Sequence, residues 1–567
     1  VRCTQSPPAQ SMDDTSVRLS HELSEGEKEA TGNRKAKVLE CLKRLGITCD
    51  KAHMPNIAIL GSGGGLRATI ALMGTLVEMK KQGLLDAVMY LCGVSGSTWC
   101  MSTLYKEKDW SENVQDLEKR LCETLSSTSW DLQQALADVS RAAEDELFSL
   151  TDVWASFCVS KELEQHDQTK LSDHKDAATC GTNPYPIYAA VEENKLHNWK
   201  KEKEVETWFE FTPHESGFPG LGAFVSTKFL GSEFMDGHLK VERKTKDICY
   251  LQGLWGSIFG YMKENVKFLI GYFENQFETV RYFRIILSYN SAYSIKVSSL
   301  NVGLKKAFFR HCMDTTSPNK KCCEMSRMWG LKTVEERIAD CAELLEAEFG
   351  EERFVSLAMQ GFGRTKRNVI ERRIHCWKVG EVISICTLIW KIWKCICHWT
   401  WGRTHNFLYN CDTIAQTSDL AKHKFLNLID AGLAINSAYP LMLLPARRVT
   451  LILSFDFSSG DPFKTIRKTA KYCETNHIPF PKIDPEEIKD RDNPSDCYIF
   501  KGKDLPTVMH FPLFNKKNCP GEVEHFRKRF STFTVSYTKG DVQELLKTAK
   551  MNVANNHERI VKEIQQL

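Results

Sequence analysis

Two strand-to-helix junctions, close together in the chain, limit its fold more than any other feature. The first joins the apolar residues 56–60 through a glycine-rich loop to a helical pattern that runs from Leu66 to about Lys81 and ends at Gly83. The second starts from another apolar run, residues 87–92. A strand, a helix and a second strand in this order predict a βαβ unit, and hence a parallel sheet with helices on its faces.

The glycine loop, GSGGGLRA, has the spacing of a dinucleotide-binding loop. Gly63, Gly65 and Ala68 match the pattern G-x-G-x-x-[GA] between a strand and a helix. In that fold the second strand ends in an acidic residue that binds the ribose, whereas here Asp86 precedes the second strand. A P-loop is also excluded, because no Gly-Lys-[Ser/Thr] follows the glycines. The sequence therefore argues against a nucleotide cofactor.

The second junction, GVSGSTW, resembles a nucleophile elbow around Ser95. A serine between small residues, after a buried strand and before a helix, projects above the sheet edge, where it can attack a carbonyl group. The strict pattern G-x-S-x-G has a glycine where this chain has Ser97. A serine nucleophile also needs N–H donors for the oxyanion, and the run from Gly63 to Gly65 offers them beside it. An ordinary structural turn would use the same residue types.

Charge and cysteine content exclude several classes of protein. The 567 residues include 75 lysines and arginines and 72 aspartates and glutamates, and the net charge of +3 provides no field that would recruit nucleic acid. Without a secretory signal, the 21 cysteines predict free thiols and a cytosolic protein. We expect no metal, because the best candidate ligands lack the paired C-x-x-C spacing of zinc sites; they are His311-Cys312, Cys322-Cys323 and Cys395-x-Cys397-His398.

Longer motifs resemble the cytosolic phospholipase A2 family (group IV). They occur in the family's order over roughly residues 37 to 560 and include NPYPIYAAVEE, TWFEFTPHESGF, LIDAGLAINSAYPLMLLPARR and LILSFDFSSGDPF, besides the two junctions. The resemblance implies a patatin-like, three-layer α/β fold, with helices on both faces of a mainly parallel central sheet and helical lid insertions. It also implies a phospholipase A2 and lysophospholipase that hydrolyses fatty acyl esters of glycerophospholipids without a cofactor.

The same resemblance assigns six residues to the active site: the nucleophile Ser95, its proton acceptor Asp430, the oxyanion-hole glycines Gly64 and Gly65, and the phosphate-binding Arg67 and Arg447. Apart from the family, Asp430 follows the apolar run FLNLI, where burial would raise its pKa into the range of a useful base. A helix-capping or turn aspartate is the plain alternative for this residue.

We expect a mobile polar tail over residues 1–36 and a single catalytic domain over residues 37–567. An insertion within about residues 260–405 would contain a lid or a membrane-interface segment. Residues 377–401 of this insertion hold five tryptophans interleaved with lysines, which suits a lipid interface, although a buried helix is the alternative. The resemblance further implies a cytoplasmic protein that associates peripherally with intracellular phospholipid membranes, of the endoplasmic reticulum or the nuclear envelope.

Two other functions stay open. A Ser-Asp-His triad would use His510 as its base, and a catalytically silent homologue would bind lipid without hydrolysing it. We expect calcium-independent activity, because only about fifty residues precede the glycine loop, too few for a calcium-binding C2 domain. Residues 490–496 are not a calcium loop either, since Ser495 stands where such a loop requires glycine.

Overall fold

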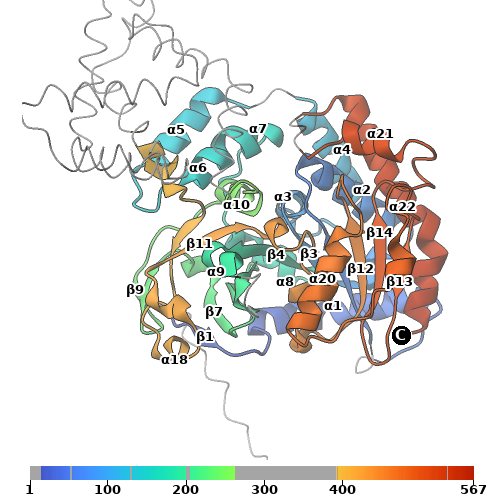
Figure 1. The fold of residues 1–567 in the computed structure, drawn as a ribbon, viewed down its shortest axis with the longest axis horizontal. Coiled ribbons are helices and arrows are strands. Elements are labelled where there is room, and N and C mark those ends of the chain that lie inside the picture. Colours follow the sequence, from blue (N-terminus) through green and yellow to red (C-terminus); the bar gives the residue numbers. More distant parts are fainter. Residues whose placement is uncertain are drawn as a thin grey trace, which may run out of the picture. The chain divides into compact units, whose positions relative to one another are not determined.

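The computed structural model describes residues 15–50, 54–127, 130–198, 205–261, 388, 391–392, 394–396, 398–532, 534 and 536–567 (Figure 1). The chain divides into two compact units, of which the smaller takes residues 140–150 and 262–400. The larger unit contains every strand described below and all six predicted site residues. Most of the predicted insertion belongs to the smaller unit and lies outside the described residues, so its role as a lid stays a prediction.

Parallel strands form the middle of a 12-stranded sheet. In order across the sheet they are β4 (Tyr185–Glu192), β3 (Val88–Gly93), β2 (Asn56–Gly61), β12 (Val449–Asp456) and β14 (Thr507–Pro512). All residues of β3, β4 and β14 are buried, as is typical of strands covered on both faces. The register aligns the carboxyl ends, because Gly61 faces Gly93 on one side and Phe455 on the other. The two predicted strands are confirmed.

The connections between these strands run in opposite directions across the sheet. Strand β2 leads through α2 (Leu66–Lys81) to β3, whereas β12 leads through α20 (Lys464–Thr475) to β14 on the other side. Right-handed crossovers therefore place α2 and α20 on opposite faces of the sheet. The direction switches between the neighbours β2 and β12, and ligands of open α/β sheets bind at the carboxyl ends of such strands. The glycine loop follows β2 at this point.

Antiparallel strands extend the parallel centre on both sides, which the sequence did not predict. Strand β13 (Tyr498–Phe500) pairs with β14. On the other side the order is β5 (Trp208–Phe211), β6 (Glu215–Phe218), β7 (Ala223–Ser226) and β1 (Arg18–Leu19), while β8 (Glu233–Met235) and β9 (His238–Val241) form a separate pair. Strand β11 (Phe425–Asp430) runs between β10 (Arg403–His405) and the end of β4. Because Asp430 pairs with Ala190 of β4, it lies at the carboxyl edge of the parallel strands.

Helices surround this sheet, and the predicted α/β class is confirmed (Figure 1). Helix α22 (Lys539–Gln565) packs along α2, and α10 (Ile248–Trp255) packs on α3 (Gly96–Leu104). Besides α1, the remaining α-helices of the described residues are α4 (Val114–Leu125), α5 (Leu132–Ala142), α6 (Leu150–Trp154), α7 (Ser160–Glu162), α8 (Lys175–Thr179), α9 (Glu193–Asn198), α18 (Asp412–Ala415), α19 (Tyr439–Met442) and α21 (Val523–Arg529).

Helix α1 (Glu25–Arg44) corrects the predicted extent of the mobile tail. The polar composition of residues 1–36 suggested mobility, but the chain is helical from Glu25 onward. Ser24 caps the helix by accepting a hydrogen bond from the Glu27 N–H at 3.0 Å. The polar side chains are compatible with burial because they are paired: Arg34 is 1% exposed and donates to the carbonyl oxygen of Val88 in β3. Residues 15–36 are thus part of the folded unit.

Candidate active site

Ser95 occupies a strained turn between β3 and α3. Its φ of 52° and ψ of −125° are rare for a residue with a side chain, and such strain is typical of a nucleophile elbow. The turn is also tightly packed, because a Cβ added to Gly96 would lie only 1.9 Å from the carbonyl oxygen of Gly65. Only glycine can follow the serine here. The predicted side-by-side placement of the two loops is therefore confirmed by this contact.

The glycine loop offers free backbone donors beside the serine. A Cβ added to Gly63 would lie 2.9 Å from Cβ of Ser95. Gly65 has a φ of 57° and begins α2, so the loop presents its N–H groups at a helix N-terminus. Among the described residues, no acceptor receives a hydrogen bond from the N–H of Gly64 or Gly65. Both groups are available to an oxyanion.

Ser97 explains the departure from the strict G-x-S-x-G pattern. Its hydroxyl donates to the carbonyl oxygen of Ser62 at 2.6 Å, and Thr69 of α2 donates to the carbonyl oxygen of Gly96 at 2.8 Å. These two bonds join the serine turn to the glycine loop and to helix α2, which follows that loop. A glycine at position 97 could not form the first bond. The Ser97 hydroxyl therefore helps to fix the distance between Ser95 and the N–H groups of the glycine loop.

Asp430 lies buried beside Ser95, with one carboxylate oxygen hydrogen-bonded. Its Oδ1 accepts from the Gly432 N–H at 2.8 Å, and its own N–H donates to the Ser257 hydroxyl at 3.2 Å. Oδ2 is buried without a well-formed hydrogen bond among the described residues. Burial raises the pKa of Asp430 to about 7, and the Gly432 N–H and the nearby Ser95 hydroxyl oppose this rise only in part. The structure thus brings Ser95, Asp430, Gly64 and Gly65 together.

Asn436 belongs to the same site, and sequence reasoning missed it. Its side-chain amide donates to the carbonyl oxygen of Gly63 at 3.1 Å and to the Ser458 hydroxyl at 3.0 Å. In return, the Gly63 N–H donates to the carbonyl oxygen of Asn436 at 3.0 Å. The residue therefore ties the segment after Asp430 to the glycine loop. The signal available in the sequence was an asparagine in the otherwise apolar run AGLAIN.

Arg67 lies against the glycine loop, with its guanidinium turned into the protein. Nε donates to the carbonyl oxygen of Phe457 at 2.6 Å, Nη1 donates to that of Phe530, and Nη2 donates to the Thr532 hydroxyl at 3.2 Å. A Cβ added to Gly64 would lie 2.7 Å from Nη2. Burial lowers the pKa of Arg67 to about 10, so the side chain is still charged at neutral pH.

The structure does not bring Arg447 to Ser95 or Asp430. Its carbonyl oxygen accepts from Asn56, at the amino end of β2, whereas the glycine loop leaves the carboxyl end. Its guanidinium is 2% exposed and pairs with two buried carboxylates, those of Glu27 and Glu210. Binding of phosphate by Arg447 stays a prediction that these contacts do not favour.

His510 is also distant from the serine. It lies in β14, three strands away from β3, which at about 4.8 Å per strand separates the two by about 14 Å. Its Nε2 donates to the carbonyl oxygen of Pro462 at 2.8 Å, and burial lowers its pKa. These contacts are typical of a structural histidine within the sheet, and they do not form a triad.

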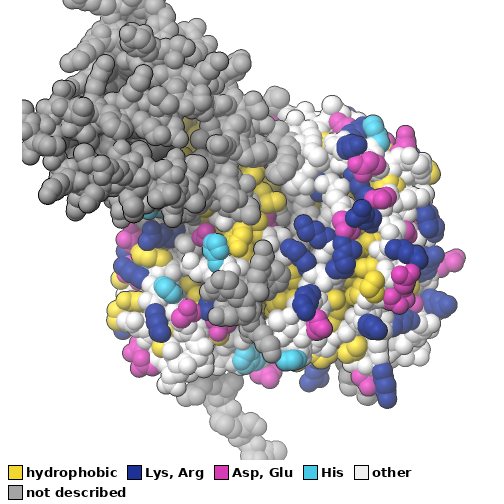
Figure 2. Space-filling model, viewed as in Figure 1, with side chains coloured by type: hydrophobic (Ala, Val, Ile, Leu, Met, Phe, Trp, Pro, Cys, Tyr) yellow, Lys and Arg dark blue, Asp and Glu magenta, His cyan; other side chains and the backbone are white. Residues whose placement is uncertain are grey.

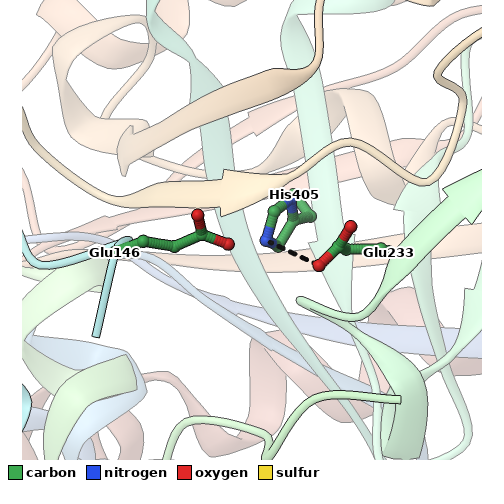
Figure 3. Close-up of side chains that lie close together, drawn as sticks. All are labelled: Glu146, Glu233 and His405. Carbon is green, nitrogen blue, oxygen red and sulfur yellow. Dashed lines mark ion pairs between the residues drawn. The ribbon is translucent and has the colours of Figure 1, made fainter. Parts of the chain in front are cut away.

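The metal candidates from the sequence fall mostly outside the described residues, since only Cys395 and His398 are described. All 13 cysteines in the described part of the chain are free thiols, in agreement with the sequence. In the larger unit the side chain of His405 points toward that of Glu233 (Figure 3). Nε2 of His405 lies 4.0 Å from Oε1 of Glu233, within the distance of an ion pair. Glu146, also drawn there, belongs to the smaller unit.

Known proteins match nearly the whole length of this chain. The family described as "Lysophospholipase catalytic domain" matches residues 57–270. Cytosolic phospholipase A2 gamma of Mus musculus is 39% identical over 553 residues, which cover 96% of this chain and 91% of that protein. The chain belongs to the cytosolic phospholipase A2 family. The Homo sapiens protein of the same name is 37% identical over 556 residues, or 98% of this chain and 96% of the relative.

A solved member of the cytosolic phospholipase A2 family has the same fold. Human GIVD cytosolic phospholipase A2 aligns with a TM-score of 0.66 and 23% identity, over 97% of this chain and 68% of that chain. Together with the family match, this confirms the resemblance inferred from the motifs. The chain is accordingly an enzyme, a phospholipase that hydrolyses carboxylic esters.

Proposed function

We propose that this enzyme is a calcium-independent phospholipase A2 and lysophospholipase that works through a Ser95–Asp430 dyad. The environment of Asp430 carries the proposal: the carboxylate is buried next to Ser95, with Oδ1 bonded to the Gly432 N–H and Oδ2 poorly satisfied. A carboxylate in such surroundings is a much stronger base than one in water. With a pKa of about 7, Asp430 is suited to take and return a proton at neutral pH.

In the acylation step, Oγ of Ser95 attacks the carbonyl carbon of a fatty acyl ester while Asp430 takes the hydroxyl proton. The carbonyl oxygen becomes an oxyanion, which the N–H groups of Gly64 and Gly65 stabilise. When the carbonyl forms again, the ester C–O bond breaks. Asp430 returns the proton to the departing lysophospholipid oxygen, and the acyl group stays on Ser95.

In the deacylation step, a water molecule is the nucleophile and the Ser95 oxygen is the leaving group. Asp430 takes a proton from the water as it attacks the acyl-serine carbonyl, and the same two N–H groups stabilise the second oxyanion. The C–O bond to Ser95 breaks, the serine oxygen recovers the proton, and the fatty acid leaves. A single base serves both steps because the proton is returned each time.

Arg67 is proposed to bind the substrate phosphate. A guanidinium has five N–H groups, and Arg67 donates three hydrogen bonds among the described residues. The other two have no acceptor among the described residues. The guanidinium is only 1% exposed, but its Nη2 lies against Gly64, the side from which we propose that a phosphate oxygen approaches. We expect Arg67→Met to impair hydrolysis of phospholipids more than hydrolysis of esters without phosphate.

The enzyme is proposed to act at the surface of intracellular phospholipid membranes from the cytoplasmic side. No helix in the described part of the chain is long and apolar enough to cross a bilayer. Helix α20 carries Lys464, Arg467, Lys468 and Lys471, and lysine and arginine side chains gather on the face of the molecule that bears this helix (Figure 2). Lys468 also donates to the carbonyl oxygen of Ala434 at 2.7 Å, which links α20 to the segment after Asp430. A basic surface near the site suits anionic lipid headgroups.

Hydrolysis assays with matched variants test the proposal. Ser95→Ala and Asp430→Asn should each abolish release of fatty acid from phosphatidylcholine and lysophosphatidylcholine, whereas His510→Asn should retain turnover. Loss of turnover in folded His510→Asn would favour the triad instead. Absence of turnover in the wild type would favour the silent lipid-binding homologue. Chelation of calcium should leave the rate unchanged, and a calcium requirement would contradict that part of the proposal.

A further inference from the structure

A buried ionic cluster joins three parts of the chain that are distant in the sequence. Arg447 donates to both carboxylate oxygens of Glu27 in α1, at 2.9 and 3.1 Å, and to both of Glu210 in β5, each at 2.8 Å. A fifth hydrogen bond, of 2.8 Å, goes to the carbonyl oxygen of Leu441. Next to the cluster, Nε of Arg18 donates to Glu215 at 2.9 Å. The charged groups that meet here thus include two arginines and three glutamates.

These five bonds use every N–H group that a guanidinium has. To bind phosphate, Arg447 would have to leave Glu27 or Glu210, whose side chains are 3% and 2% exposed. Breaking a buried ion pair from one side leaves the other charge uncompensated, which is strongly unfavourable. Arg67 is equally buried, at 1% exposed, but it forms no ion pair among the described residues, and two of its N–H groups have no acceptor there. The two arginines assigned to phosphate by resemblance therefore have different surroundings.

Arg447 lies near the end of the segment that carries the proposed base. This segment leaves β11 at Asp430, is bound to the glycine loop at Asn436, and reaches β12 at Val449. Just before β12, Arg448 has a φ of 48°, a left-handed conformation that is uncommon for a residue with a side chain. The ionic cluster holds the chain one residue before this turn.

We propose that Arg447 is a positioning residue, which together with Glu27 and Glu210 fixes the segment from Asp430 to β12, and that it does not contact the substrate phosphate. The proposal rests on the dyad proposed above. It gives helix α1 an indirect role in catalysis, because Glu27 comes from the first turn of this helix. Loosening the cluster would let the segment move, so that Asp430 would be better hydrated and less well placed against Ser95.

Two substrates separate positioning from phosphate binding: phosphatidylcholine, and a coumarin ester of a fatty acid, which has no phosphate. Arg447→Met should lower kcat at least tenfold for both substrates by a similar factor, with little change in KM. It should also shift the acidic limb of the pH profile to lower pH, because a hydrated Asp430 has a lower pKa. A loss confined to phosphatidylcholine would overturn the proposal, as would an equal loss with an unshifted pH profile.

Glu27→Gln provides a milder test should Arg447→Met fail to fold, because it keeps the shape of the side chain and removes only its charge. Glu27→Gln should lower kcat by a smaller factor on both substrates and shift the acidic limb of the pH profile in the same direction. Full activity with an unshifted pH profile would overturn the proposal. Arg120→Met, at a surface arginine 56% exposed, is the matched control and should behave as the wild type. Turnover retained by Ser95→Ala or Asp430→Asn would refute the dyad itself, whatever Arg447→Met does.

Discussion

Replacing Asp430 by asparagine should stabilise the fold, and more strongly as the pH rises. Burial raises the pKa of Asp430 from 3.8 to about 7, so between these values the folded chain holds a proton that the unfolded chain has released. Because folding raises the pKa of this acid, the free energy of unfolding falls as the pH rises through this window, by about 1.4 kcal/mol per pH unit. Above pH 7 the ionised carboxylate therefore destabilises the native state by about 4 kcal/mol. Asparagine has no charge to bury and can still accept from the Gly432 N–H.

Urea unfolding of the wild type and Asp430→Asn at pH 5 and pH 8, followed by tryptophan fluorescence, measures this effect. The difference in unfolding free energy between the two proteins should grow by about 3 kcal/mol from pH 5 to pH 8. Comparing two pH values cancels any effect of the substitution that does not depend on pH. Ser95→Ala changes the same site without removing the charge, and it should lose stability with rising pH at least as steeply as the wild type, because the Ser95 hydroxyl opposes the rise in the pKa of Asp430. A difference that is the same at both pH values would refute the buried-base argument.

Three further predictions follow from the site and its surroundings. The value of kcat/KM should rise with pH and level off above about pH 7, since Asp430 must be ionised to accept a proton; a profile that stays level down to pH 5 would contradict this. Gly96→Ala should lower turnover more than a hundredfold, because its Cβ would lie 1.9 Å from the carbonyl oxygen of Gly65. Gly32→Ala in α1, with no atom within 4 Å of the new Cβ, is its control and should stay active. Combining Lys464→Glu with Arg467→Glu should weaken sedimentation with anionic vesicles at low salt, compared with the same reversals at Lys119 and Arg120; equal binding would rule out α20 as the contact.

The βαβ unit and the tight turn at Ser95 could be predicted because their signals are local. An apolar run, a glycine turn and a helical period lie within a few residues of one another, and the crowding of glycines around Ser95 follows from the same turn. Asp430 is different. It is more than three hundred residues from Ser95 in the chain, and only the family motifs connected the two before the structure brought them together.

Features that depend on long-range pairing could not be predicted in this way. The antiparallel edges of the sheet result from a register that no local pattern specifies. The first part of helix α1, residues 25–36, looked like a mobile tail because the partners of its polar side chains, such as Val88 for Arg34, come from elsewhere in the chain. For the same reason the sequence could not distinguish Arg67 from Arg447, whose carboxylate partners lie far away along the chain.

Covalent labelling by a fluorophosphonate tests the central claim, a Ser95 nucleophile activated by Asp430, most directly. We predict one adduct per chain, located by mass spectrometry on Ser95. The adduct should be absent in Ser95→Ala, greatly slowed in Asp430→Asn and formed at the normal rate in His510→Asn. An adduct formed equally well in Ser95→Ala, or no adduct in folded wild type, would contradict the account.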